Sequence, residues 1–161
     1  AVDLSQFTKS ESAQQWESFA RDELAPILYP NICRSLSESM EAFEYVKHLR
    51  SEDGFSPMQK LLVRGVGSLA MYLAASRIKS KRNITDEREA LYNALTQFEE
   101  KGLDHGNKLY GSGLDHPNIG DIAMYGVINS VSGLKVHEDA ILNRGGVVSG
   151  WYERMQKDMS N

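Results

Sequence analysis

Apolar residues recur along this chain three or four positions apart, and no stretch alternates apolar and polar residues in the manner of a strand. The longest pattern of this kind runs from Pro57 to about Arg82. One face of the predicted helix carries large apolar side chains, namely Met58, Leu62, Val66, Leu69 and Leu73. Ser56 can cap this helix, with Pro57 at the first helical position, where a missing amide costs nothing. We expect the apolar face to lie in the hydrophobic core.

Similar patterns predict helices on both sides of this one. Apolar stripes fall in residues 16–27, 36–43, 91–98, 122–128, 137–142 and 151–155, and a glycine-rich loop without a stripe occupies residues 102–116. The first helix should end near Pro30, because proline has no amide to continue the helical hydrogen bonds. We therefore predict an all-α bundle of about six or seven helices, with residues 1–12 as a polar N-terminal segment and residues 13–161 as one helical domain.

Residues 116–125, HPNIGDIAMY, combine a helix start with an apolar run. Asn118 can accept hydrogen bonds from free amides of the first turn, while Asp121 can accept one from the Asn118 amide, and together they make a capping box. Pro117 and Ile122 stand at the two positions of a hydrophobic staple. The motif predicts a well-defined start for a central helix with little polar surface, and its role is structural rather than catalytic.

The composition is that of an ordinary globular protein, with 41% hydrophobic and 25% charged residues. A formal net charge of −4 provides no overall attraction to nucleic acid, so a nucleic-acid partner is not expected. We also expect no transmembrane segment, because no uninterrupted apolar stretch approaches the roughly 20 residues that span a bilayer. The start of the chain lacks the layout of a signal peptide.

Cysteine and histidine offer little catalytic or metal-binding chemistry in this sequence. Cys33 is the sole cysteine, which excludes an internal disulfide and a CxxC site, and we expect a buried, inert thiol there. The four histidines, His48, His105, His116 and His137, fall in different segments without metal-ligand spacing. The sequence therefore predicts no metal site and no catalytic residue.

The strongest candidate for ligand binding is a pair of cations at the end of the long helix. Arg77 and Lys81 stand one helical turn apart and therefore on the same face. Two cations there could hold a carboxylate pair. Alternatively, basic residues in the last turn complement the negative end of the helix, which contributes a few tenths to about 1 kcal/mol each. The residues alone favour this second explanation.

The capping box that introduces a central apolar helix resembles the core motif of the glutathione transferase C-terminal domain. Further segments, within about Trp16 to Met155, resemble the C-terminal half of the type 2 prostaglandin E synthases, a branch of that superfamily. These segments are Pro30-Asn31, Ala70-Met71-Tyr72-Leu73, Arg77-Ile78-Lys79-Ser80, Pro117-Asn118, Asp121-Ile122-Ala123, Tyr125-Gly126-Val127 and Trp151-Tyr152. The resemblance implies a helical domain that gives a substrate-side wall and dimer contacts to a glutathione-dependent isomerase or transferase.

The resemblance also implies a ligand site. In that family an arginine at the position of Arg77 and a basic residue at that of Lys81 line the cleft that takes glutathione and haem carboxylates, so glutathione is the expected ligand. Haem is not expected, because Pro26 stands where the family type has a haem-coordinating histidine. The thiol chemistry of the family resides in an N-terminal thioredoxin-like half with a CxxC motif. This chain has no such half, and we expect it to be inactive alone.

Two functions stay open. In the first, the chain is the helical half of such an enzyme, completed by a thioredoxin-like domain or a partner protein and able to form a homodimer. In the second, it is a non-enzymatic scaffold subunit of a larger, mitochondrial assembly, which the loss of the histidine at Pro26 favours. The resemblance implies an intracellular location, either cytoplasmic or mitochondrial, with any membrane association through a segment outside this chain.

Overall fold

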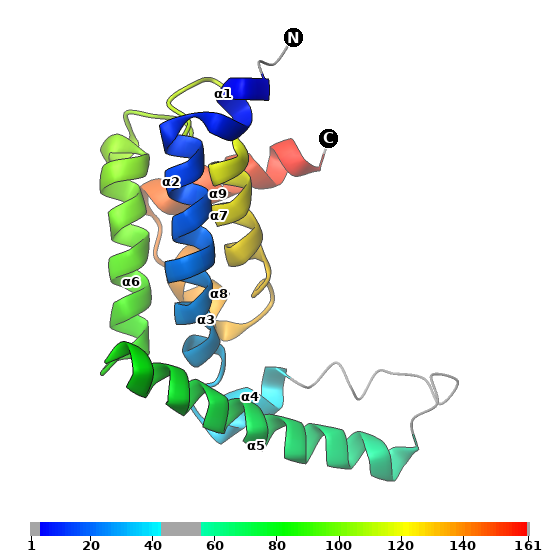
Figure 1. The fold of residues 1–161 in the computed structure, drawn as a ribbon. Helices are drawn as coiled ribbons and strands as arrows, with labels where there is room; N and C mark the ends of the chain where they lie inside the picture. Colours follow the sequence, from blue (N-terminus) through cyan, green and yellow to red (C-terminus); the bar gives the residue numbers. More distant parts are fainter. Residues whose placement is uncertain (1–3, 43–55, 161) are drawn as a thin grey trace. The chain divides into compact units, whose positions relative to one another are not determined.

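The computed structural model describes residues 4–42 and 56–160, and every regular element within them is helical (Figure 1). The predicted all-α class is therefore confirmed. The chain divides into two compact units, which are described separately. We call residues 1–27 together with 88–161 the bundle unit, and residues 28–87 the α5 unit, after its longest helix.

The bundle unit contains most of the helices. Its elements are α1 (Leu4–Lys9), α2 (Glu11–Phe19), a π-helical turn (Ala20–Leu24), the start of α3 (Ala25–Ile32), α6 (Glu87–Gln97, of which the first residue belongs to the α5 unit), a π-helical turn (Phe98–Gly102), a 3-10 turn (Asp104–Gly106), α7 (Ile119–Asn129), α8 (Lys135–His137), a further π-helical turn (Glu138–Leu142) and α9 (Gly146–Met159). The predicted polar segment, residues 1–12, thus contains α1 and the first residues of α2.

The core of the bundle unit forms where α2 packs against α7. The rings of Trp16, Phe98 and Trp151 are buried and meet edge to face, with centroids 4.8 Å apart for the first pair and 4.9 Å for the second. Gly120 allows the two helices to approach closely, because a Cβ atom there would lie only 2.9 Å from the Ala13 carbonyl oxygen. The predicted central helix is therefore α7.

The first long helix ends at Ile32, close to Pro30 as predicted, but both of its prolines lie inside it. Helical residues run unbroken from the start of α2 to the end of α3, with Pro30 inside. Directly before Pro26 the backbone adopts π-helical geometry, and the Ala25 amide donates to the Ala20 carbonyl. Such a local change in hydrogen-bond register is one way in which a helix accommodates an inserted proline, which has no amide to donate.

The α5 unit pairs a long helix with a short one. It consists of the end of α3, α4 (Leu36–Ala42) and α5 (Pro57–Arg82), and α4 packs on α5. The buried Ser68 hydroxyl of α5 donates a hydrogen bond to the Ser39 carbonyl of α4 at 3.2 Å. α5 begins at the predicted N-cap: the Ser56 hydroxyl accepts from the Gln59 amide, and the Gln59 side chain accepts from the Ser56 amide.

The prediction that the apolar face of α5 belongs to the core is wrong. Its large apolar side chains are between 49% and 66% exposed, namely Met58, Leu62, Val66, Leu69 and Leu73. The residues that α5 buries are instead small, Ser68 and Ala75. Helical periodicity gives the direction of an apolar face but not the partner that covers it. Phe43, which the sequence placed on the stripe of the preceding helix, lies outside the described residues.

α5 also bears on the expectation that the chain has no transmembrane segment. By length and composition alone this helix could cross a bilayer, because it has 26 residues and an 18-residue window with a mean hydropathy of 1.3. Only 11% of that window is buried. Arg64 and Arg77 interrupt its apolar residues, so it contains no uninterrupted apolar stretch of the length that spans a bilayer. Core helices of soluble proteins meet the same two criteria, so they identify a candidate and not a membrane span.

Candidate functional site

Asn118 and Asp121 form the predicted capping box at the start of α7. The Asn118 side chain accepts hydrogen bonds from the Gly120 amide at 2.8 Å and the Asp121 amide at 3.1 Å. The Asp121 carboxylate in turn accepts one from the Asn118 amide at 3.1 Å. Asn118 has an extended backbone, as an N-cap residue should, and both side chains are buried. Both reciprocal hydrogen bonds of the box are therefore present.

The Asp121 carboxylate does more than cap α7. It also accepts hydrogen bonds from the Gly111 amide at 2.6 Å, the Ser112 amide at 3.1 Å and the Trp151 indole at 3.1 Å. Burial raises the pKa of Asp121, and the N–H donors around it oppose that shift. The carboxylate joins the glycine-rich loop, α7 and α9, so its role is to organise the bundle unit.

Arg77 and Lys81 lie together at the C-terminal end of α5. With Ala74, Ile78 and Ser80 they line an open hollow of about 530 Å³. Both cationic side chains are exposed, and the surface between them is largely apolar. An anionic group and a neighbouring apolar group could therefore both find a complementary surface here.

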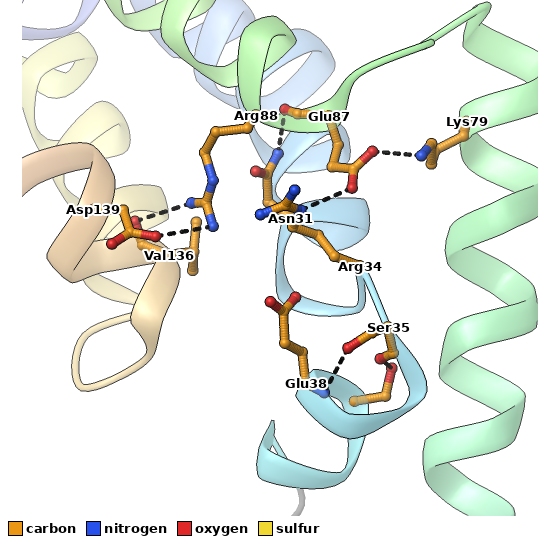
Figure 2. Close-up of polar contacts among 10 residues, drawn as sticks. Asn31, Arg34, Ser35, Glu38, Lys79, Glu87, Arg88, Val136 and Asp139 are labelled. Atoms are coloured by element: carbon orange, nitrogen blue, oxygen red, sulfur yellow. Dashed lines mark hydrogen bonds and ion pairs between the residues drawn. The ribbon is translucent and has the colours of Figure 1, made fainter.

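A third cation of the same helix end is used in a structural cluster. Lys79 donates to the Glu87 carboxylate, which also accepts a hydrogen bond from Arg34 Nε at 3.0 Å (Figure 2). Burial raises the pKa of Glu87, but hydrogen bonds from Lys79, from a backbone amide and from Arg34 outweigh burial and hold the pKa below its usual value. The Asn31 side chain donates to the Glu87 carbonyl at 2.6 Å. The cluster fixes the ends of α3 and α5 to the start of α6.

Arg77 and Lys81 differ from Lys79 in having no such partner. Within residues 4–42 and 56–160, neither forms a salt bridge. Both are therefore available to an external anion. Arg77 can offer two parallel N–H groups to a carboxylate, whereas Lys81 acts as a point charge. Their place near the end of the helix also satisfies the alternative explanation, in which they complement the helix dipole.

Cys33 and His137 are both buried. Cys33 is buried, and burial raises the pKa of its thiol, with a hydrogen bond from Ser39 opposing the shift only in part. A buried, protonated thiol is a poor nucleophile, in agreement with the predicted inert role. In the described part of the chain, no group of three or more His, Cys, Asp or Glu side chains could hold a metal ion. His137 is buried beside Tyr152, and His48 lies outside the described residues.

Sequence reasoning missed the long-range partners of these groups. Trp151 was expected only on the apolar stripe of the last helix. Its indole N–H also donates a hydrogen bond to the Asp121 carboxylate, 30 positions earlier in the chain. Glu87, the first residue of α6, was not among the predicted site residues. Its neighbour Arg88 lies in the bundle unit, where it pairs with Asp139 at 3.4 Å (Figure 2). No local signal connects such residues, because the fold brings them together.

Comparison with known proteins gives a relative for most of this chain. No family model matches it. It is 31% identical over 149 residues to prostaglandin E synthase 2 of Mus musculus, covering 89% of this chain and 35% of that protein. It is also 31% identical over 144 residues to prostaglandin E synthase 2 of Danio rerio, covering 89% of this chain and 36% of that protein. The chain is thus homologous to prostaglandin E synthase 2 over most of its length, and it spans about a third of the length of these relatives.

Proposed function

We propose that this chain is the helical C-terminal domain of a glutathione-transferase-like protein of the prostaglandin E synthase 2 kind. In this role it supplies one wall of the substrate site and contacts for a dimer, and it works with a thioredoxin-like half that carries the thiol chemistry. The observation that carries the proposal is the homology to prostaglandin E synthase 2 over 89% of the chain. The capping box of α7, which resembles the core motif of glutathione transferase C-terminal domains, supports the same assignment.

The proposed ligand contact is the hollow at the end of α5. Glutathione carries two carboxylates and a largely neutral peptide body, which suits two cations beside an apolar surface. Arg77 would bind one carboxylate through two parallel hydrogen bonds, and Lys81 would add a second positive charge without that fixed geometry. The absence of competing salt bridges at these two residues within the described part of the chain supports this use.

We assign no catalytic group to this site among the described residues. A glutathione thiol needs a hydrogen-bond donor to stabilise its thiolate, and neither Arg77 nor Lys81 is assigned that task. The buried Cys33 is unsuited to replace a reactive thiol. We therefore expect the isolated chain to bind glutathione weakly and to lack isomerase or transferase activity. Haem binding is not proposed, because Pro26 in the first turn of α3 has no ligating atom.

A second candidate function is a non-enzymatic scaffold within a larger assembly, for which a mitochondrial location is the expectation. Two observations favour it. Pro26 replaces a ligating residue of the family type, and the apolar face of α5 is exposed in the way an interaction surface would be. An enzyme domain that is separated from its thioredoxin-like half should expose an apolar face as well. The exposure of the α5 face therefore does not distinguish the two functions.

Isothermal calorimetry with glutathione separates them. We expect wild-type chain to release heat with a dissociation constant in the millimolar range, about 4 kcal/mol of binding free energy, and Arg77→Glu to abolish it. Lys101→Glu, which makes the same change of charge at an exposed position of the bundle unit, is the matched control and should bind like wild type. Equal binding by Arg77→Glu, or no binding by wild type at these concentrations, would reject the proposed site and leave the scaffold function.

A further inference from the structure

Ser80, near the end of α5, has an unused hydroxyl group. A serine inside a helix can donate its hydroxyl hydrogen bond to the carbonyl one turn earlier. The exposed Ser76 does so, donating to the Tyr72 carbonyl at 3.1 Å. Ser80 is exposed as well, but in the described part of the chain its hydroxyl makes no hydrogen bond. The Ser80 hydroxyl is therefore available for modification.

The residues on both sides of Ser80 are basic. The flanking cations are Arg77, Lys79, Lys81 and Arg82, at three and one residues before Ser80 and one and two residues after it. No acidic residue occurs anywhere in α5. Serine kinases with an acidic substrate cleft select their acceptor serines by such neighbouring cations, because opposite charges attract. The segment therefore has the charge pattern of a substrate for a basophilic kinase.

Ser80 also lines the hollow that contains Arg77 and Lys81. Arg77 and Ser80 are three residues apart and so are neighbours on one face of the helix. A phosphoryl group on Ser80 would add about −1.5 to −2 charges near pH 7 and three acceptor oxygens. Neither Arg77 nor Lys81 forms a salt bridge with a described residue, so both can turn toward the phosphate. The hollow thus contains an acceptor hydroxyl together with two cations that suit its phosphate.

The position of Ser80 at the end of a helix affects both steps. The C-terminal end carries a partial negative charge of about half an electron, which repels an added anion. Arg77 and Lys81 carry two full positive charges beside the phosphate, so attraction outweighs this repulsion. Kinases bind their substrate segment extended, so residues 77–82 must unwind first. These are the last six residues of α5, and helix ends open at a lower free energy than the core.

We propose that phosphorylation of Ser80 by a basophilic serine kinase closes this hollow to glutathione. The γ-phosphoryl group of ATP passes to Ser80 Oγ: a new O–P bond forms, the bond from the γ-phosphorus to the bridging oxygen breaks, and ADP leaves. The hydroxyl proton passes to a carboxylate of the kinase. Arg77 then donates its N–H groups to the phosphate, and Lys81 pairs with it. The inference rests on the proposed function for the ligand and adds its regulation.

Incubation of the folded chain with such a kinase and Mg-ATP, followed by mass spectrometry, tests the modification. Wild type and Ser76→Ala should each gain a phosphoryl group, and Ser80→Ala should gain none. Ser76→Ala is the matched control, because it removes an exposed hydroxyl one turn away in the same helix. Uptake by Ser80→Ala equal to that of wild type, or no uptake by wild type, would reject Ser80 as the acceptor.

Phosphorus NMR shows whether the hollow holds the phosphate, and this measurement does not involve glutathione. The sample is the chain with a phosphoryl group built onto Ser80 during synthesis. A phosphoserine has a second pKa of about 6. Two neighbouring cations should lower this pKa because they favour the dianion, and Arg77→Gln should move it back toward about 6. A pKa of about 6 in both proteins would place the phosphate outside the hollow and overturn the mechanism.

Calorimetry with glutathione tests the closure, with the unphosphorylated chain as the reference. The chain phosphorylated at Ser80 should bind glutathione at least about 10-fold more weakly, because the phosphate cancels most of the positive charge of the hollow. Equal binding by both forms would reject the closure and leave the proposed function intact. No binding by the unphosphorylated chain would reject the proposed function, and the closure with it. The two failures are therefore distinguishable.

Discussion

Replacing Asp121 is the sharpest test of how the bundle unit is held together. Its carboxylate accepts four N–H hydrogen bonds, from the Asn118 amide that belongs to the capping box and from Gly111, Ser112 and Trp151 outside it. The side chain is fully buried, so water cannot replace a lost acceptor. Asp121→Ala should therefore destabilise the unit by far more than the loss of a helix cap.

The magnitude follows from the separate contacts. Opening the capping box costs about 1 kcal/mol, and each buried donor left without an acceptor costs about 1–3 kcal/mol. The Gly111 amide and the Trp151 indole would be the two buried donors left unpaired. Because neighbouring effects are not additive, we expect about 3–5 kcal/mol for Asp121→Ala. Asn118→Ala removes the acceptor of the Gly120 and Asp121 amides and a hydrogen bond to the Ser12 hydroxyl, and the loss of such an N-cap costs about 1–2 kcal/mol.

Urea denaturation followed by tryptophan fluorescence measures these changes. The two tryptophans of the chain, Trp16 and Trp151, both lie in the bundle unit, so fluorescence reports that unit. Asp121→Asn keeps the volume but turns an amide NH₂ toward two N–H donors, and it should cost at least about 2 kcal/mol. Asp115→Ala, at an exposed carboxylate of the same loop, should stay within about 0.5 kcal/mol of wild type. A loss for Asp121→Ala no larger than that for Asn118→Ala would refute the reasoning.

Two further predictions concern packing and pH. Gly120→Ala should destabilise the bundle unit by about 1–3 kcal/mol, because the new Cβ would lie 2.9 Å from the Ala13 carbonyl oxygen. Gly126→Ala in the same helix is the control: its Cβ meets nothing within 4 Å, so it should stabilise by about 0.5–1 kcal/mol. Midpoints of urea denaturation measure both changes. Burial lowers the pKa of His137 below the ordinary 6.5, so the unfolded chain binds the proton first and stability should fall as the pH drops below 6.5. His137→Leu should flatten the dependence of unfolding free energy on pH between about pH 7.5 and 5.5. His105→Asn, at an exposed histidine, should leave that dependence unchanged. If His137→Leu has the same pH dependence as wild type, His137 is not the group responsible.

The features that the sequence predicted correctly are local. The helix starts at Asn118 and Ser56 depend on residues within one turn, and a spacing of three residues is enough to identify them. Arg77 and Lys81 line the same hollow because four residues make about one turn of helix. In each case the helix itself, and not the tertiary fold, sets the geometry.

The features that the sequence did not predict depend on what packs against each helix. The face of α5 looked like core because a buried face and an interface have the same apolar period. The π-helical turn that precedes Pro26 was not predicted either, because no simple residue rule identifies such a turn. The partners of Glu87 and Asp121 come from distant segments, so they required the fold.

The most direct test of the proposed function is to locate glutathione on the chain. In ¹H–¹⁵N correlation spectra recorded during a glutathione titration, we predict saturating shifts concentrated in residues 74–81, at the end of α5, and their loss in Arg77→Glu. Shifts that do not saturate by millimolar concentrations, or that centre on the Asp121 network instead, would contradict the assignment of this hollow as the glutathione contact.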